Sequence, residues 1–283
     1  MKRILTTILA ILLCAACFGA QAEGAEMTVV NCNEWVSLRQ SPDTSSARLL
    51  EVPLGATVSN CNFQVGDFVC CSYQGQTGYI LAEYLTGAQP VQATGELAAM
   101  MNARWCSVNA AAGGYTLIGE RSYSGAEETN RVACFDSQGQ MLWQRVLSGT
   151  ATELDVTDAF LGGTAAQPLA MLYENYCLHA LELSTGEELW TLNEDLGASI
   201  TAAVAEDGTM YIGGYYGPDP VAISANGEVI WRSSSGFDAC WLYKLDITGE
   251  GLLATYDSID NYGNSGTILY GFDGSTLDVR VNG

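Results

Sequence analysis

The sequence is poor in lysine and histidine, and both shortages limit the chemistry that it can support. Its 283 residues hold one histidine and 11 lysines and arginines, against 32 aspartates and glutamates. Beyond residue 22 the only lysine is Lys244. Phosphate backbones and anionic lipid surfaces repel a chain with a net charge of −21, so we expect no nucleic-acid partner.

The same shortages argue against catalysis and metal binding. Nucleophile-and-base catalysis commonly uses a positioned histidine, and only His179 exists. Structural zinc sites commonly pair cysteines as C-x-x-C, a pattern that is absent after residue 22. We therefore predict no catalytic residues, no metal site and no cofactor, so the protein is not expected to be an enzyme.

Long apolar runs are absent except at the N-terminus. Lys2-Arg3 precedes a mostly apolar stretch over residues 4–18, and Ala20-Gln21-Ala22 follows as an A-x-A cleavage pattern. This predicts a signal peptide over residues 1–22, no transmembrane segment, and a secreted or cell-envelope location. A lipid anchor at Cys17 is the alternative, but the aliphatic residue usual three places before a lipidated cysteine is missing.

Residues 27–88 form a stretch of short strands separated by turn residues. The turns hold Ser41-Pro42-Asp43, Val65-Gly66-Asp67 and Gln74-Gly75-Gln76. The strands read VVNC, WVSLRQ, ARLLEV, ATVSNC, FVCCSYQ and TGYILAEYL. Such a pattern predicts a small all-β domain.

This stretch resembles the bacterial SH3-type (SH3b) family in three places along the chain. VSLRQSPD at 36–43 is similar to the family's opening, LGATV at 54–58 to its middle step, and FVCCSYQGQTGYI at 68–80 to its closing strands. Phe68 stands where the family usually has a tryptophan. The resemblance implies an SH3-like barrel that binds cell-wall peptides or other envelope ligands.

Eight cysteines remain after the predicted signal peptide, an even number that permits disulfides in an exported chain. A hairpin that turns at Val65-Gly66 places Cys61 opposite Cys70, where a disulfide is expected. Cys71 then points to the other face. It is expected to be a buried thiol, because it occupies the core valine position of the SH3b pattern.

Residues 89–103 change in character and predict a linker. A polar stretch with proline and glycine is followed by ELAAMMNAR, which predicts one or two helical turns. The domain boundary is expected near Pro90.

Residues 104–283 repeat a unit of four strands about four times. The clearest marks are Trp143, Trp190 and Trp231, which are 47 and 41 residues apart. The fourth unit puts Val281 near the tryptophan position. Four strands at this period indicate the blades of a β-propeller, so the predicted fold class is all-β, a barrel followed by a four-bladed, propeller-like domain.

The repeat resembles the PQQ-type (quinoprotein-like) propeller family. HALELSTGEELW at 179–190 is the closest copy of its motif, and LYGFD at 269–273 matches the first half. One large aromatic per blade at a fixed place is expected to pack neighbouring blades. The resemblance implies a propeller that either binds a quinone cofactor or serves as a platform for protein partners.

Four blades are fewer than the family normally has, so the exposed blade faces need cover. Closure into a small ring, capping by the SH3-like domain and homodimerisation are the three solutions. Cys106 and Cys240 start corresponding inner strands of the first and fourth blades. A disulfide between them would latch a closed ring.

Three functions follow for testing. The first is an exported bacterial cell-envelope binding or scaffold protein, with cell-wall peptide, peptidoglycan or an envelope protein as partner. For this binding role the loop Tyr215–Asp219 offers contact residues. The second is a propeller that binds a small ligand or cofactor, for which the acidic loop Asp257–Asn264 offers oxygen ligands to calcium. The third is a cell-wall hydrolase that uses Cys106 and His179, although Cys106 leads into a strand rather than a helix.

Overall fold

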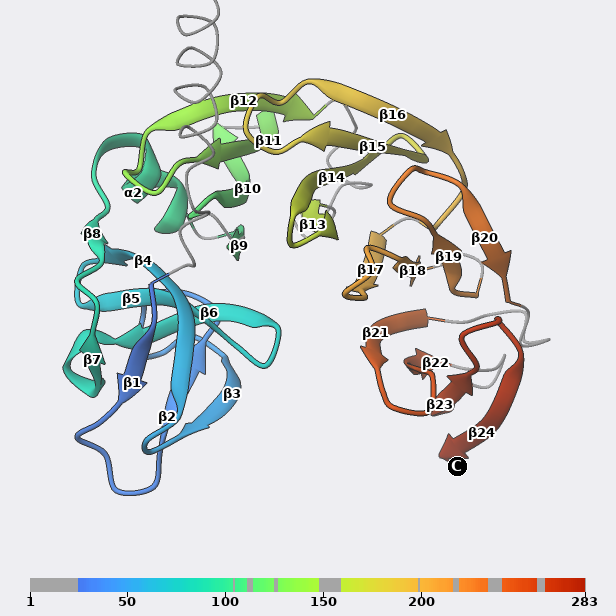
Figure 1. Cartoon of the computed structure of the whole chain (residues 1–283), viewed down its shortest axis with the longest axis horizontal. Helices are drawn as coiled ribbons and strands as arrows, with labels where there is room; N and C mark the ends of the chain where they lie inside the picture. Colours follow the sequence, from blue (N-terminus) through green and yellow to red (C-terminus); the bar gives the residue numbers. More distant parts are fainter. Residues whose placement is uncertain are drawn as a thin grey trace, which may run out of the picture.

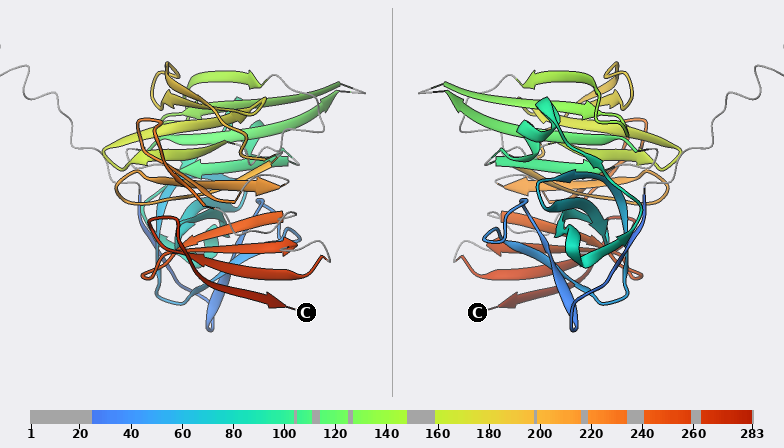
Figure 2. Two further views of the ribbon diagram at one scale, coloured as in Figure 1. Left: turned by 90° about the vertical axis from the view of Figure 1, so that its right-hand side faces the viewer. Right: turned by 90° about the vertical axis from the view of Figure 1, so that its left-hand side faces the viewer.

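The computed structural model describes residues 25–282 except 104, 111–113, 125–126, 148–158, 198, 216–218, 234–240 and 259–262. The predicted signal peptide and Cys17 lie outside this part of the chain. The described residues form an all-β structure in which an N-terminal unit is followed by two four-stranded antiparallel sheets and one eight-stranded antiparallel sheet. The eight-stranded sheet consists of two four-stranded units that are joined where Tyr215 of β18 pairs with Trp241 of β21. Figure 1 shows the four-stranded units following one another along an arc, and Figure 2 shows the same arc from its two sides.

No helix within the described residues is long and apolar enough to cross a membrane.

The N-terminal unit is one curved sheet with strand order β3-β2-β6-β5-β4-β1-β7, and β8 pairs with β4. Alternation of apolar and polar residues along these strands fills its core with Val29, Leu38, Val58 and Ile80, each without exposed surface. The elements are β1 (Met27–Val29), β2 (Trp35–Arg39), β3 (Arg48–Pro53), β4 (Thr57–Val65), β5 (Phe68–Tyr73), β6 (Gln76–Leu81), η2 (Ala82–Tyr84), β7 (Leu85–Gly87) and β8 (Val91–Gln92).

The predicted Cys61–Cys70 disulfide is wrong, because the β4–β5 hairpin has a different register. Phe63 lies opposite Cys70, and an irregularity in β4 with Asn60 at φ +54° turns the preceding residues to the other face. Cys70 therefore packs toward the linker helix, whereas Cys61 and Cys71 share the core of the unit. All three are free thiols, and the prediction that Cys71 is buried is confirmed.

The four-stranded units are numbered here as blades one to four, and within each blade consecutive strands pair antiparallel from an inner to an outer strand. This confirms the predicted four-strand repeat. The strands are β9 (Trp105–Ala110), β10 (Thr116–Ser124), β11 (Glu127–Phe135) and β12 (Met141–Leu147); β13 (Ala159–Thr164), β14 (Gln167–Glu174), β15 (Cys177–Glu182) and β16 (Glu188–Asn193); β17 (Ser199–Val204), β18 (Met210–Tyr215), β19 (Val221–Ile223) and β20 (Val229–Arg232); β21 (Trp241–Ile247), β22 (Leu252–Ser258), β23 (Ser265–Tyr270) and β24 (Thr276–Asn282).

The outer-strand tryptophan of each of the first three blades docks on the following blade. Its indole nitrogen donates to a carbonyl in the last turn of that blade, and its ring covers the glycine of the same turn. The donor and acceptor pairs are Trp143 with Leu183 (2.8 Å), Trp190 with Ala225 (3.0 Å) and Trp231 with Phe272 (2.8 Å). The covered glycines are Gly186, Gly227 and Gly274.

These glycines are required for two reasons. Each has a positive φ, between +72° and +84°, a conformation that side chains disfavour. A Cβ on any of them would also lie 2.7–2.8 Å from the docked tryptophan ring. The turn and the contact between blades therefore depend on the same residue.

Blade four ends this series with a different residue. Trp190 follows its turn glycine by four residues and pairs with Ala180. At the same distance from Gly274 stands Asp278, which pairs with Leu269. Val281 is therefore not the equivalent of the tryptophans. The whole of β24 is exposed, and Asp278 forms an ion pair with Arg280 on its own strand.

The N-terminal unit takes the place of a preceding blade at the start of the series. A Cβ on Gly139, the turn glycine of blade one, would lie 3.0 Å from Leu97 and 3.5 Å from Phe63. Leu97 belongs to the linker helix α2 (Gly95–Met101), which agrees with the predicted helical turns. These residues form one buried cluster with Ile118 and Phe135 of blade one. The N-terminal unit and α2 therefore cap blade one, which is one of the three predicted ways to cover an end of the series.

Arginines link successive units across their junctions. Arg131 of blade one pairs with Glu96 of α2, and Arg145 lies 2.9 Å from Glu174 of blade two. Arg232 of blade three holds both carboxylate oxygens of Glu194, which follows blade two, at 2.7 and 2.8 Å. Three arginines thus bridge neighbouring units.

Replacing a docked tryptophan should destabilise the propeller more than a matched change in blade four. We expect Trp190→Ala to lower the free energy of unfolding by about 2–4 kcal/mol, because it removes a large contact and leaves a cavity between blades. Asp278→Ala, at the equivalent position without a following blade, should change it by less than about 0.5 kcal/mol. Urea unfolding measures both, and equal losses would contradict the docking role.

The Glu194–Arg232 pair should stabilise the fold only while Glu194 is ionised. Its hydrogen bond to Arg232 lowers the pKa of Glu194, so the stabilisation is present above the unfolded glutamate pKa of about 4.3 and is lost as the pH falls below it. We expect Glu194→Gln to cost about 0.5–1 kcal/mol at pH 7 and almost nothing near pH 3. Asp278→Asn, in an exposed pair, is the control, and a pH-independent cost for Glu194→Gln would refute the assignment.

Candidate functional site

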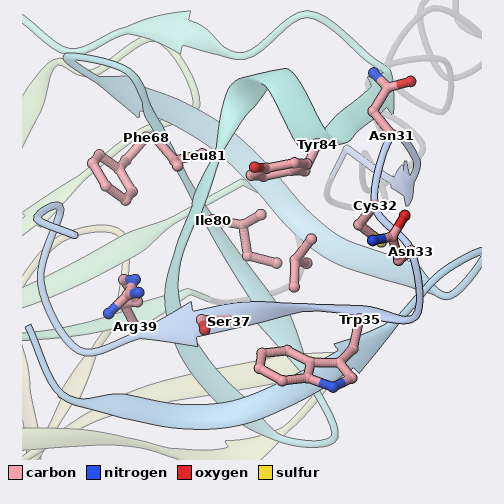
Figure 3. Close-up of a pocket in the computed structure, with 11 residues that line it drawn as sticks. Asn31, Cys32, Asn33, Trp35, Ser37, Arg39, Phe68, Ile80, Leu81 and Tyr84 are labelled. Carbon is pink, nitrogen blue, oxygen red and sulfur yellow. The ribbon is translucent and has the colours of Figure 1, made fainter.

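A groove of about 400 Å³ on the N-terminal unit is the candidate site. It lies between strand β2 on one side and the end of β6 with η2 on the other, as Figure 3 shows. The residues that line it are Asn31, Cys32, Asn33, Trp35, Val36, Ser37, Arg39, Phe68, Ile80, Leu81 and Tyr84.

Local backbone geometry places the polar residues of the groove. Asn31 has φ +58°, which turns the chain between β1 and β2, and its side-chain amide donates to the carbonyl of Glu83 at 2.9 Å. The loop is thereby tied to η2. Along β2, Leu38 points into the core while Trp35 and Arg39 remain accessible, as expected for alternating strand residues.

Aromatic and aliphatic side chains form the walls of the groove. Ile80 has no exposed surface and Phe68 only 7%, so both belong to the rigid interior. Trp35 is 39% exposed, and the guanidinium of Arg48 lies 4.9 Å from the centre of its ring. In Figure 3, Tyr84 and Phe68 lie across the groove from Trp35 and Arg39, with Ile80 between them.

The charge of the groove is opposite to that of the chain. Among the described residues that line it, Arg39 is the only one with a charged side chain, and none is an aspartate, glutamate, lysine or histidine. One nitrogen of Arg39 donates to the carbonyl of Ser46 at 2.8 Å, which fixes the guanidinium and leaves further donors for a ligand. An aromatic wall, neutral amides and one guanidinium suit a short peptide that carries a carboxylate.

The residues of the hydrolase alternative do not come together. Cys106 lies on β9 of blade one, where burial, with Glu120 nearby, raises the pKa of its thiol to about 11. His179 lies on β15 of blade two, with Nδ1 2.9 Å from a carboxylate oxygen of Glu188. Arg145 donates to the same oxygen at 3.4 Å. His179 thus belongs to the junction between blades one and two.

Two further predictions fall partly outside the described residues. Cys106 is a free thiol, and its predicted partner Cys240 is not described. Of the loop over residues 257–264, residues 259–262 are not described either. In the part of the chain that is described, no three histidine, cysteine or carboxylate side chains are grouped so as to hold a metal ion.

Of the loop over residues 215–219, residues 216–218 are not described, and its two ends make structural contacts. Asp219 accepts hydrogen bonds from the hydroxyls of Tyr256 and Tyr270 at 3.4 and 3.3 Å, and burial raises the pKa of Tyr270. Asp219 therefore joins blades three and four. At the other end of the loop, Tyr215 is 37% exposed and its ring centre is 4.9 Å from that of Trp241.

Of the groove residues, the sequence singled out Phe68 through the SH3b resemblance but not Trp35 or Arg39 as ligand contacts, although a signal for these two exists. The strand WVSLR alternates apolar core positions with Trp35, Ser37 and Arg39. A tryptophan and an arginine on the accessible face of a short strand are unusual for a purely structural role. Their approach to Tyr84, however, depends on how β6 and η2 fold back over β2.

Because burial raises the pKa of Cys106, its thiol should be unreactive in the folded chain. Because only the thiolate reacts quickly, we expect iodoacetamide at pH 8 to modify Cys106 in the folded chain at most about one hundredth as fast as in the urea-unfolded chain. Mass spectrometry of the peptide that contains Cys106 measures both rates. Rapid labelling in the folded state would instead identify an activated nucleophile.

Comparisons with known proteins show a distant likeness of fold. No protein-family model matches the chain, and no curated protein matches it. A Bacteroides caccae protein of unknown function is 11% identical, with a TM-score of 0.41 over 92% of this chain and 94% of that one. The β-propeller domain of Myceliophteria thermophila Cps50 (Swd1) is 12% identical, with a TM-score of 0.38 over 89% and 87%. Kluyveromyces lactis Hsv2 is 12% identical, with a TM-score of 0.32 over 91% and 84%. The chain has an all-β, propeller-like fold, and these values carry no argument about its function.

Proposed function

We propose that this chain is an exported bacterial cell-envelope binding or scaffold protein, and that it is not an enzyme. In this proposal the N-terminal unit is an SH3b-like module whose groove binds a cell-wall peptide or another envelope ligand. The PQQ-type propeller serves as a platform for a protein partner.

The observation that carries the proposal is the pairing of exposed Trp35 with Arg39 along one groove. Tryptophan and arginine are the side chains that most often dominate binding energy. Their placement in a groove without carboxylates or histidine favours recognition over hydrolysis. A ligand carboxylate at Arg39 would also find a local positive charge on an otherwise acidic protein.

The rim of the propeller supports the platform role. In each of the first three blades, the residue before the docked tryptophan is aliphatic and exposed. In blade four, the residue before Asp278 is also aliphatic and exposed. These residues are Leu142 (40% exposed), Leu189 (53%), Ile230 (54%) and Leu277 (54%). One exposed aliphatic side chain per blade, at the same place on each outer strand, suits a partner that spans several blades.

A propeller that binds a small ligand is the second candidate. It is favoured by a cavity that the inner strands of the blades line together. Homodimerisation of an open propeller remains a prediction, and sedimentation of the chain from residue 23 onward tests it.

The groove should be necessary for retention on cell wall. We expect the chain from residue 23 onward to sediment with purified peptidoglycan, and Trp35→Ala or Arg39→Gln to weaken this binding about tenfold or more, since each removes a hot-spot side chain. Leu54→Ala is the control, because Leu54 is exposed on the same unit but does not line the groove. No retention of the unaltered chain would overturn the wall ligand, and undiminished binding by both groove variants would overturn the site.

A further inference from the structure

A cavity of about 700 Å³ lies at the centre of the arc of blades. All four inner strands contribute to its wall, β9 by Asn109, β13 by Phe160 and Leu161, β17 by residues 201–204 and β21 by residues 243–247. The β5–β6 turn of the N-terminal unit, residues 74–77, completes the wall. Figure 1 looks into the arc that these strands surround. The cavity therefore exists only when the N-terminal unit and the propeller are assembled together.

We propose that this central cavity is a second binding site, for a neutral, polyhydroxylated ligand of the carbohydrate class. The cavity has the volume of a typical small-ligand site. It is separate from the groove on the N-terminal unit, with which it shares no lining residue.

The charge of the lining selects for a neutral ligand. The chain carries 32 acidic residues, yet among the described residues Asp246 is the only acidic one that lines the cavity, and Lys244 pairs with it at 2.9 Å. The remaining polar side chains are uncharged, among them Gln76, Thr201 and Asn109. An ionic ligand would lose its hydration without finding a free counter-charge, whereas hydroxyl groups find amides and hydroxyls as partners.

Tyr243 provides an aromatic face at the cavity. It is 54% exposed, and the pairing of β21 with β22 shifts register between Leu242 and Lys244, so that Tyr243 is the extra residue of a β-bulge. The other three inner strands, β9, β13 and β17, pair with their neighbours without a shift. Bulges redirect side chains and occur beside functional sites. An exposed tyrosine ring beside neutral polar groups is suited to stack on the C–H face of a sugar.

Gln76 supplies a polar contact on the opposite wall. Its side-chain oxygen is buried and, within the described residues, has no hydrogen-bond donor. A buried acceptor without a donor costs about 1–3 kcal/mol. Turning this amide toward a sugar hydroxyl would recover that loss. Gln76 comes from the N-terminal unit and Tyr243 from blade four, so a bound sugar would contact both ends of the arc.

Calorimetric titration of the chain from residue 23 onward with neutral trisaccharides tests the proposal. The probes are cellotriose and triacetylchitotriose, and trigalacturonic acid is the charged comparison. We expect one of the neutral sugars to bind at a single site, and the acidic sugar to bind at least about tenfold more weakly. No binding of either neutral sugar, or stronger binding of the acidic one, would overturn the proposal.

Variants locate the site and separate it from the groove. Tyr243→Ala should weaken the binding about tenfold or more, and Tyr243→Phe should largely preserve it, because the ring remains. Tyr176→Ala is the matched control, since Tyr176 is 49% exposed on blade two and does not line the cavity. Trp35→Ala should leave sugar binding unchanged, so the groove and the cavity can fail independently. Unchanged urea midpoints establish that the variants fold, and equal binding by Tyr243→Ala and the unaltered chain would refute the assignment.

Discussion

The docking of a tryptophan ring on the turn glycine of the next blade is the contact on which the order of the blades depends. It combines burial of a large aromatic with one directional hydrogen bond from the indole nitrogen, made at 2.8 Å by Trp143. A side chain on Gly186 would displace the ring. The contact always runs from one blade to the next along the chain, and the first and fourth blades of the described structure have different residues at these positions. Leu97 and Phe63 cover the first turn glycine, and Asp278 replaces the last tryptophan.

Polar contacts complement this packing at the junctions. Hydrophobic burial is not directional, so it holds two blades together without fixing their angle. Arg145 and Arg232 each reach a carboxylate across a junction, and between blades three and four Asp219 binds a buried pair of tyrosine hydroxyls. Lys244 is the one cation among the described residues that line the central cavity.

The two hollows of the molecule differ in what they require. The groove is built within the N-terminal unit, where Asn31 fixes a loop against η2 and the alternation of β2 exposes Trp35. The central cavity is built from the inner strands together with the turn that holds Gln76. Ligand binding in the groove is therefore compatible with movement between units. Binding in the cavity would instead hold the N-terminal unit and blade four in one arrangement.

The sequence by itself determined the elements that depend on local chemistry. Strand alternation, turn glycines and the spacing of Trp143, Trp190 and Trp231 were sufficient to predict the four-strand blades, because each of these patterns arises within a few residues. The sequence did not predict local changes in strand register. The irregularity at Asn60 separates Cys61 from Cys70. In blade four, the position of the turn glycine makes Asp278, and not Val281, the counterpart of the tryptophans. Only the tertiary structure placed Trp35 across from Tyr84 and put Gln76 on the same cavity as Tyr243. Those pairs lie far apart in the chain, and what joins them is the way strands curve and blades dock, which no local pattern records.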